Sequence, residues 1–292
     1  MTNISRSKIR QVALSYLYTY LTHGSQPVDS AVFWSIAQEK EVDNLRMARA
    51  KALLHTARAT ADSARLLAER VQNLENLMHA DLTAAGLLEE VQRYANQSSN
   101  FDAAVKALQY CVADKRRDTT DQLVLCAGDV MRLAKAVLGL GRDLQPRFAD
   151  FPAYRQQLDA LTAAMNRRAR MLEICTQLED LKSMEGNKEF AGLVRMNQDM
   201  LELRPAVETL AKAIIAHIPL MEPRLESLLA NYSLERLDLV DRCILYIALY
   251  ELTENGLQVP IVVSEVTALA HEYSGSKSAQ FIHGVVAAAA KN

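Results

Sequence analysis

A cluster of basic side chains near the start of the chain has the chemistry to hold an anionic polymer. Arg6, Lys8 and Arg10 occur close together, and no acidic residue comes before Asp29. Guanidinium and ammonium groups bind phosphate oxygens, and Tyr18 offers a ring for stacking on a base. Arg6, Lys8, Arg10 and Tyr18 are therefore candidates for contacts with a nucleic acid, although three cations by themselves favour a solvated helix end. A solvated helix end for the cations and a core position for Tyr18 are the alternative interpretations.

A second group of polar residues lies near the C-terminus, in the segment Gly-Ser-Lys-Ser-Ala-Gln at 275–280. Backbone N–H groups at a helix N-terminus, two hydroxyls and one ammonium group together form a seat for a phosphate. Ser276, Lys277, Ser278 and Gln280 are the candidates for binding a phosphate there. A capped turn without a ligand is an equally good interpretation of the same residues.

The elements that must position these side chains are helices. The stretch 238–252 begins with Asp238, a natural N-cap, and Asp241 follows near the positive end of the helix dipole. Two apolar stripes then recur at helical spacing, so this helix needs packing partners on both sides and is expected at the centre of a bundle. The stripes consist of Leu237, Val240, Ile244, Ile247 and Ala248, and of Leu245, Leu249 and Leu252.

The stretch 228–252 resembles the hallmark segment of the NusB family, bacterial RNA-binding antitermination factors with an all-helical fold. The resemblance continues through 259–266, Val-Pro-Ile-Val-Val-Ser-Glu-Val, which is similar to the family's proline-started helix. It extends to 281–286, Phe-Ile-His-Gly-Val-Val, which is similar to the family's closing Phe-Val-Asn-Gly-Val-Leu motif.

The N-terminus resembles the same family. Residues 6–10, Arg-Ser-Lys-Ile-Arg, and 13–18, Ala-Leu-Ser-Tyr-Leu-Tyr, are similar to the family's arginine-rich entry into its first helix. The matching parts cover about residues 4–24 and 207–288, and the long middle of the chain has no counterpart.

The resemblance implies a function, its partners and the residues that bind RNA. The RNA-binding residues it implies are Arg6, Lys8, Arg10 and Tyr18 near the N-terminus, with Ser276, Lys277, Ser278 and Gln280 as a second candidate surface. It implies a protein that binds the boxA element of RNA as a heterodimer with the ribosomal protein NusE, acts indirectly on the transcribing RNA polymerase complex, and supports ribosomal RNA synthesis. It also implies that Asp241, Arg242 and Tyr246 on the central helix face the protein partner. Helix capping and an internal ion pair that includes Glu251 are the alternative.

Four positions depart from the family's pattern. Lys277 stands where an acidic residue is common, Gln280 where a lysine is common, and His283 where an asparagine is common. Tyr246 replaces a frequent arginine. These departures leave a second function open, a helical protein-interaction scaffold whose insertion recruits a partner and whose host has lost RNA binding. The regulatory domain of an RNA cytosine methyltransferase is less favoured, because the sequence ends soon after the closing motif.

We predict an all-α fold, a NusB-like helical bundle interrupted by an insertion that forms a long helical hairpin or a small bundle. The host comprises residues 1–40 and 188–292, and the insertion comprises 41–187. Proline removes a backbone donor, so Pro219 and Pro223 predict a kink or helix boundary near 218–223. Within the insertion we expect helices over about 42–80, 84–96, 101–114 and 120–140 and a break at Gly139 and Gly141 that Pro146 and Pro152 extend. A second long helix is expected from Tyr154 to about 185–187.

Composition excludes several other classes of protein. No apolar run approaches the roughly 18–20 residues of a membrane span, and no signal peptide begins the chain, so we expect a cytoplasmic protein. The four cysteines are far apart and favour core positions over a disulfide or zinc framework. The six histidines are scattered, and Gly139-Leu140-Gly141 follows a helical pattern rather than a strand. We predict no catalytic site, cofactor or metal.

The net charge of -2 argues against bulk attraction of RNA. We expect a local basic patch instead, because the charges that cancel it in the total lie largely on the insertion and screening limits their reach to about 8–10 Å.

Overall fold

The computed structural model describes residues 4–24, 28, 31–58, 61–114, 120–229 and 233–291, and every regular element in them is a helix. The all-α prediction is confirmed. Short 3-10 helices lie at η1 (Leu82–Ala84), η3 (Gln145–Asp150), η4 (Pro152–Tyr154), η5 (Leu181–Met184), η6 (Lys188–Phe190) and η7 (Leu234–Arg236). The α-helices are α1 (Arg6–Thr22), α2 (Ala31–Ala37), α3 (Glu39–Arg58), α4 (Ala61–Met78), α5 (Ala85–Ala113), α6 (Thr120–Leu144), α7 (Arg155–Gln177), α8 (Ala191–Leu228), α9 (Leu239–Thr253), α10 (Val259–Tyr273) and α11 (Ser276–Ala289).

Backbone contacts divide the chain into two compact units. Unit 1 consists of Met1–Glu39 and Gln198–Asn292, and unit 2 consists of Lys40–Asn197. The N-terminal and C-terminal segments therefore fold into one body, and the division at its C-terminal side lies inside α8. Within unit 1 the side-chain amide of Gln38 donates a hydrogen bond to the carbonyl oxygen of Met200 at 3.3 Å. The two points at which the chain leaves and re-enters unit 1 are thus close together.

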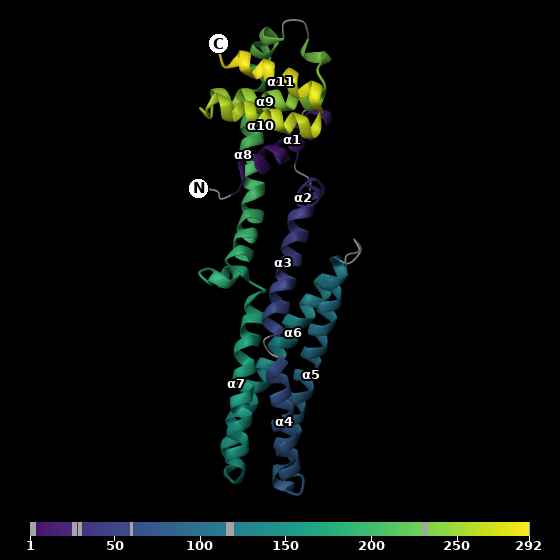
Figure 1. The fold of residues 1–292 in the computed structure, drawn as a ribbon, viewed down its shortest axis with the longest axis vertical. Helices are drawn as coiled ribbons and strands as arrows, with labels where there is room; N and C mark the ends of the chain where they lie inside the picture. The colour runs from purple at the N-terminus through teal and green to yellow at the C-terminus, as the bar shows by residue number, and fades with distance from the viewer. Residues whose placement is uncertain are drawn as a thin grey trace. The chain divides into compact units, whose positions relative to one another are not determined.

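Helix α9 forms the centre of unit 1, as its two apolar stripes predict. The Asp238 carboxylate caps the helix by accepting a hydrogen bond from the backbone N–H of Val240 at 2.8 Å. Nine of the 15 residues of α9 are buried. The helix packs against α1, α10 and α11 (Figure 1). Residues 230–232, part of the stretch that resembles the family's hallmark, lie outside the described residues.

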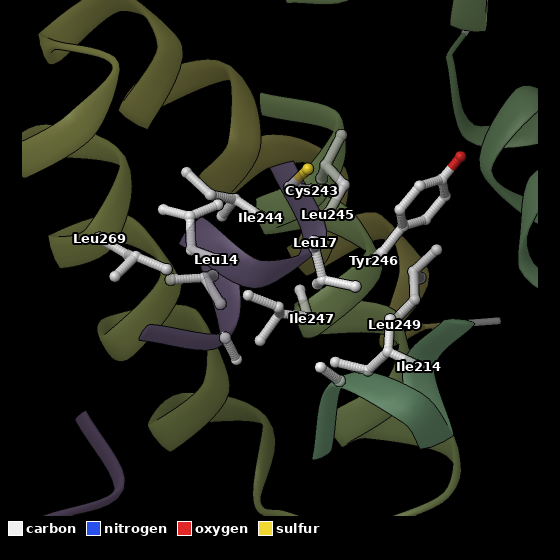
Figure 2. Close-up of a cluster of buried hydrophobic side chains, with 14 of the residues drawn as sticks. Leu14, Leu17, Ile214, Cys243, Ile244, Leu245, Tyr246, Ile247, Leu249 and Leu269 are labelled. Carbon is white, nitrogen blue, oxygen red and sulfur yellow. The ribbon is translucent and has the colours of Figure 1, made fainter. Parts of the chain in front are cut away.

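The core of unit 1 joins segments from both ends of the chain. Figure 2 shows Leu14 and Leu17 of α1 among the aliphatic side chains of α9, with Ile214 of α8 close to Leu249. All of these side chains are buried. Burial of an aliphatic side chain contributes about 1.5–3 kcal/mol, so this cluster is a main source of the free energy that holds α1 onto α9.

Unit 2 is a helical bundle of its own. Helix α5 packs along α6, α6 packs on α7, and α4 packs on both α5 and α7 (Figure 1). The region expected as one helix over 42–80 contains α3 and α4, and residues 59 and 60 between them lie outside the described residues. The two helices expected at 84–96 and 101–114 are one continuous helix, α5.

The break predicted at Gly139 and Gly141 is wrong, and the structure shows no helix boundary near 218–223, where a kink stays a prediction. Helix α6 passes through Gly139 and Gly141 and ends at Leu144, just before Pro146. Helix α8 likewise passes through Pro219 and Pro223 and ends at Leu228. A helical glycine costs only about 1 kcal/mol and a proline about 3 kcal/mol, and burial of the same helices against their neighbours offsets these costs.

The structure also bears on membrane insertion. In the part of the chain that is described, no helix is both long enough and apolar enough to cross a bilayer.

Candidate nucleic-acid interface

The first turns of α1 and α11 share an arrangement that is unfavourable for an isolated helix. Helix α1 begins after Ser5, whose side chain does not cap it, and carries Arg6 and Lys8 in its first turn with no acidic residue. Helix α11 begins after Gly275 and carries Lys277 in its first turn, again with no acidic residue. Cations beside the positive end of a helix dipole cost about 0.3–1 kcal/mol each. Both helix starts therefore favour an external anion.

The residue before α11 limits which groups can accept hydrogen bonds from the N–H groups of its first turn. Gly275 has a φ of 102°, in the left-handed region that L side chains rarely adopt. Glycine fits this backbone without strain but brings no side chain to cap the N–H groups of the first turn. This contrasts with α9, where Asp238 satisfies a backbone donor.

The predicted residues at the start of α1 have different exposures. Arg6 is exposed, Lys8 is half-buried and interacts within the chain, and Tyr18 is 41% exposed. Arg6 also lines a cavity of about 590 Å³ between the start of α1, the middle of α8 and the end of α9, where Tyr250 and Asn255 contribute to its wall. The arrangement leaves the guanidinium of Arg6 and the ring of Tyr18 accessible to a ligand.

The predicted residues at the start of α11 lie around a second cavity. Ser276, Lys277 and Gln280 are exposed and Ser278 is half-buried. Lys277 and Ser278 line a cavity of about 260 Å³ whose walls also include Arg236. Arg236 is not among the residues predicted from the sequence, because a single arginine just before a helix start carries no signal of its own.

The two helix starts lie at opposite ends of α9. The cavity beside Arg6 is lined by Tyr250 and Asn255, at the end of α9, whereas the cavity beside Lys277 is lined by Asp238 and Asp241, at its start. A rise of 1.5 Å per residue separates these positions by about 15–25 Å along the helix axis. A single phosphate cannot reach both, but a nucleic-acid strand of several nucleotides spans that distance.

Arg10 requires a correction, because it is buried rather than available to RNA. Its side chain is 2% exposed, and its Nε donates to both carboxylate oxygens of Glu251 at 2.8 and 2.9 Å. Its Nη1 donates to Glu265 at 2.9 Å. Burial raises the pKa of Glu251, and the guanidinium of Arg10 opposes that rise. The role of Arg10 is thus to join α1, α9 and α10 through a desolvated ion-pair network.

The three residues predicted to face a protein partner are mostly engaged within unit 1. Asp241 is buried and accepts a hydrogen bond from the hydroxyl of Ser274 at 2.5 Å. Arg242 donates to Glu222 at 2.5 Å and to the Tyr246 hydroxyl at 2.6 Å. The Tyr246 hydroxyl in turn donates to Glu222 at 2.7 Å, and Figure 2 shows its oxygen pointing away from the aliphatic cluster.

Tyr246 was predicted to face a protein partner, but its placement does not allow this. Its ring is fully buried, so it cannot supply contact area to a partner. Burial raises the pKa of Tyr246, with its hydrogen bond to Glu222 as a further cause. The alternative of an internal ion pair describes this region better, although Arg242 pairs with a carboxylate from α8 and not with a neighbour on its own helix.

The distribution of charge between the units also differs from the expectation. Unit 1 contains 10 Lys and Arg against 14 Asp and Glu, whereas unit 2 contains 23 against 21. The acidic excess therefore lies in the unit that carries both helix starts, and unit 2 is slightly basic. Any attraction of RNA to unit 1 must come from local groups and not from its net charge.

Comparisons with known proteins relate this chain to one family. The sequence model of the NusB family matches residues 165–291. Residues 4–24 lie outside that match, so the resemblance of the first helix to the family stays a prediction. The comparison with solved structures gave no match.

Three relatives are each described as a transcription antitermination protein NusB. The chain is 32% identical to that of Methylacidiphilum infernorum over 127 residues, which is 41% of this chain and 87% of the relative. It is 32% identical to that of Clostridium tetani over 120 residues, 41% of this chain and 78% of the relative. It is 33% identical to that of Solibacter usitatus over 85 residues, 29% of this chain.

The extent of these alignments differs among the relatives. The chain spans 58% of the length of the Solibacter usitatus protein and 59% of that of Pseudothermotoga lettingae, but most of the length of the other two. The family consists of non-enzymatic transcription factors. With an all-helical fold, a family match over the whole of α9, α10 and α11, and relatives covered over most of their length, the chain belongs to the NusB family.

Proposed function

We propose that this protein is an antitermination factor that binds boxA-like RNA together with the ribosomal protein NusE and thereby supports transcription of ribosomal RNA. The observation that carries the proposal is the pair of helix starts in unit 1 with basic first turns and no side-chain cap. Helix N-termini of this kind bind phosphate groups. Binding, and not bond chemistry, is the proposed activity.

Each predicted residue has a role suited to its placement. Arg6 and Lys277 hold phosphates at the two ends of the site, and Tyr18 provides an exposed ring for base stacking. The hydroxyls of Ser276 and Ser278 and the amide of Gln280 supply polar contacts to the strand. Lys8, half-buried and engaged within the chain, makes a smaller contribution.

The proposed contact with NusE involves the start and middle of α9. Arg242 is half-buried, with a quarter of its side chain accessible, and contributes to the partner surface, whereas Asp241 is buried and lines the cavity at the start of α9. Their hydrogen bonds to Glu222 and Ser274 fix the side chains before a partner arrives. A fixed side chain loses less conformational entropy on binding.

Titration of labelled boxA RNA tests the proposal directly. The double variant R6A/K277A should bind at least about tenfold more weakly, because two charge-assisted contacts to phosphate are lost. K212A is the matched control, since Lys212 is an exposed cation on α8 that pairs with Glu208 and lines neither of the two cavities beside the helix starts. Equal losses in R6A/K277A and in K212A would contradict the assignment.

Salt dependence separates phosphate contacts from other kinds of binding. For a single strand, log affinity falls with log salt by about 0.7 per phosphate contact, so R6A/K277A should lower the slope by about 1.4. Cooperative tightening on addition of NusE is expected. An unchanged slope would place the phosphate contacts elsewhere.

The acidic excess of unit 1 and the departures at Lys277, Gln280 and His283 favour a second candidate, a protein-interaction scaffold. In that case the full-length protein binds no boxA RNA, either alone or with NusE. The same titration therefore decides between the two functions.

A further inference from the structure

Two thiols meet where α5 ends and α6 begins. Cys111 lies in the last turn of α5 and Cys126 in the second turn of α6, and their Sγ atoms are 3.1 Å apart. Both cysteines are free thiols. A disulfide requires a sulfur separation of about 2.05 Å, so the two sulfurs need to approach by only about 1 Å. Small side-chain rotations on two neighbouring helices provide that movement.

The pair is accessible in a way that the other cysteines are not. Cys111 is half-buried, and the residues next to the two cysteines, Tyr110 and Leu125, are exposed. Cys175 and Cys243 are fully buried. A small oxidant in solution therefore reaches Cys111 much more readily than either of them.

We propose that Cys111 and Cys126 form an oxidation site at which a peroxide converts the two thiols into an intramolecular disulfide between α5 and α6. The sulfur of Cys111 loses its proton to water and attacks the peroxide. The O–O bond breaks, leaving a sulfenic acid and releasing water. The sulfur of Cys126 then attacks the Cys111 sulfur, the S–O bond breaks, and hydroxide leaves with the proton of the Cys126 thiol as a second water.

With hydrogen peroxide as the oxidant, the atoms and electrons of this reaction balance. Two thiols and one peroxide give one disulfide and two waters, and two electrons pass from sulfur to oxygen. The side-chain amide of Gln122 donates to the Sγ of Cys126 at 3.6 Å, on the side of the resolving sulfur.

The surroundings make the reaction slow at neutral pH. Burial raises the pKa of Cys111 to about 11, and Cys126 and Asp114 add to the rise. The thiolate is the nucleophile, so little of it is present at pH 7. The site therefore responds to sustained or concentrated peroxide and not to trace amounts.

Peptide mapping of the full-length protein tests the proposal. Reduced protein is treated with hydrogen peroxide, remaining thiols are alkylated, and trypsin is added. Lys115, Arg116 and Arg117 lie between the two cysteines, so the disulfide should appear as two tryptic peptides joined by one bond. Of the 4 thiols titrated in denaturant, two should disappear, and dithiothreitol should restore them.

Two variants make the result specific. C111S and C126S should each abolish the joined peptides, while Cys175 and Cys243 are recovered as alkylated thiols in every sample. The oxidised wild-type protein should also melt at a higher temperature than the reduced one, because the bond closes the loop between the helices. Sulfonic acid at Cys111 without joined peptides, or disulfides that link separate molecules, would overturn the proposal.

Discussion

Two arginines one helical turn apart have opposite roles in this protein. Arg6 is exposed at the start of α1, whereas Arg10 is buried and paired with Glu251 and Glu265. The sequence shows both as members of one basic cluster, because the carboxylates that hold Arg10 come from 241 and 255 residues away. The sequence shows the positive charge of Arg10, but it does not show which carboxylates bind that charge.

Removal of Arg10 should destabilise the protein strongly. R10A leaves the buried carboxylate of Glu251 without its partner, which costs about 3–5 kcal/mol in the free energy of unfolding. R6A should change that free energy by less than about 0.5 kcal/mol, since Arg6 lies at the surface. Urea unfolding followed by circular dichroism measures both. Equal stability of R10A and R6A would show that the buried network is dispensable.

The destabilisation in R10A should depend on pH. Burial already raises the pKa of Glu251, and loss of the guanidinium removes the opposing effect, so the folded variant holds this proton more tightly than the unfolded chain. Stability is then fully present below the unfolded pKa of about 4.3 and falls as pH rises toward the folded value. The difference from wild type should therefore be larger at pH 7 than at pH 4. Unfolding at both values checks it, and E251Q in the R10A background should remove the dependence.

At the scale of helices, the spacing of apolar residues predicted where helices form better than glycine and proline predicted where they end. The apolar stripes of α9 and the cap at Asp238 were readable because both depend on neighbours along the chain. Gly139, Gly141, Pro219 and Pro223 were misleading because tertiary burial, which the sequence does not display, keeps α6 and α8 continuous.

The two glycines of α6 provide a test of that explanation. A Cβ added at Gly139 would meet no other atom within 4 Å, so G139A should raise the free energy of unfolding by up to about 1 kcal/mol. A Cβ at Gly141 would lie 3.3 Å from the ring of Tyr94 and 3.6 Å from Met165, and G141A should therefore gain less or lose stability. Thermal unfolding of the two variants gives the comparison. Equal gains would mean that the ring of Tyr94 moves aside freely.

At the scale of the whole molecule, the resemblance of both ends to one family predicted that they fold together, and they do so in unit 1. The sequence could not assign a role to the middle, since the family model begins only at residue 165 and most of the middle lies outside it. The sequence also suggested that the charges that cancel the basic patch lie largely on the insertion, whereas the acidic excess lies in unit 1. The limits of a unit come from contacts in the folded protein, so the charge of each unit could not be counted from the sequence alone.

Deletion of unit 2 tests which unit carries the proposed RNA contacts. Replacing Lys40–Asn197 with a short Gly-Ser linker should leave unit 1 folded, because the hydrogen bond from Gln38 to Met200 places the two ends within a linker's reach. Circular dichroism should show a helical protein, and boxA RNA should bind as it does to the full-length chain. Retained folding with lost RNA binding would assign the RNA contacts to unit 2, and R6A/K277A in the deleted chain is the control for binding at the helix starts.

The proximity of Gln38 and Met200 has a consequence for how such a chain can arise. Loop-closure entropy grows only as the logarithm of length, so even an unstructured excursion of that size would cost about 3 kcal/mol more than a five-residue turn. A prefolded excursion with adjacent ends costs less still. Ancestral genes could therefore gain, lose or exchange the entire middle at a single locus without re-threading the surrounding helices, and an engineer could graft an unrelated domain at the same junction.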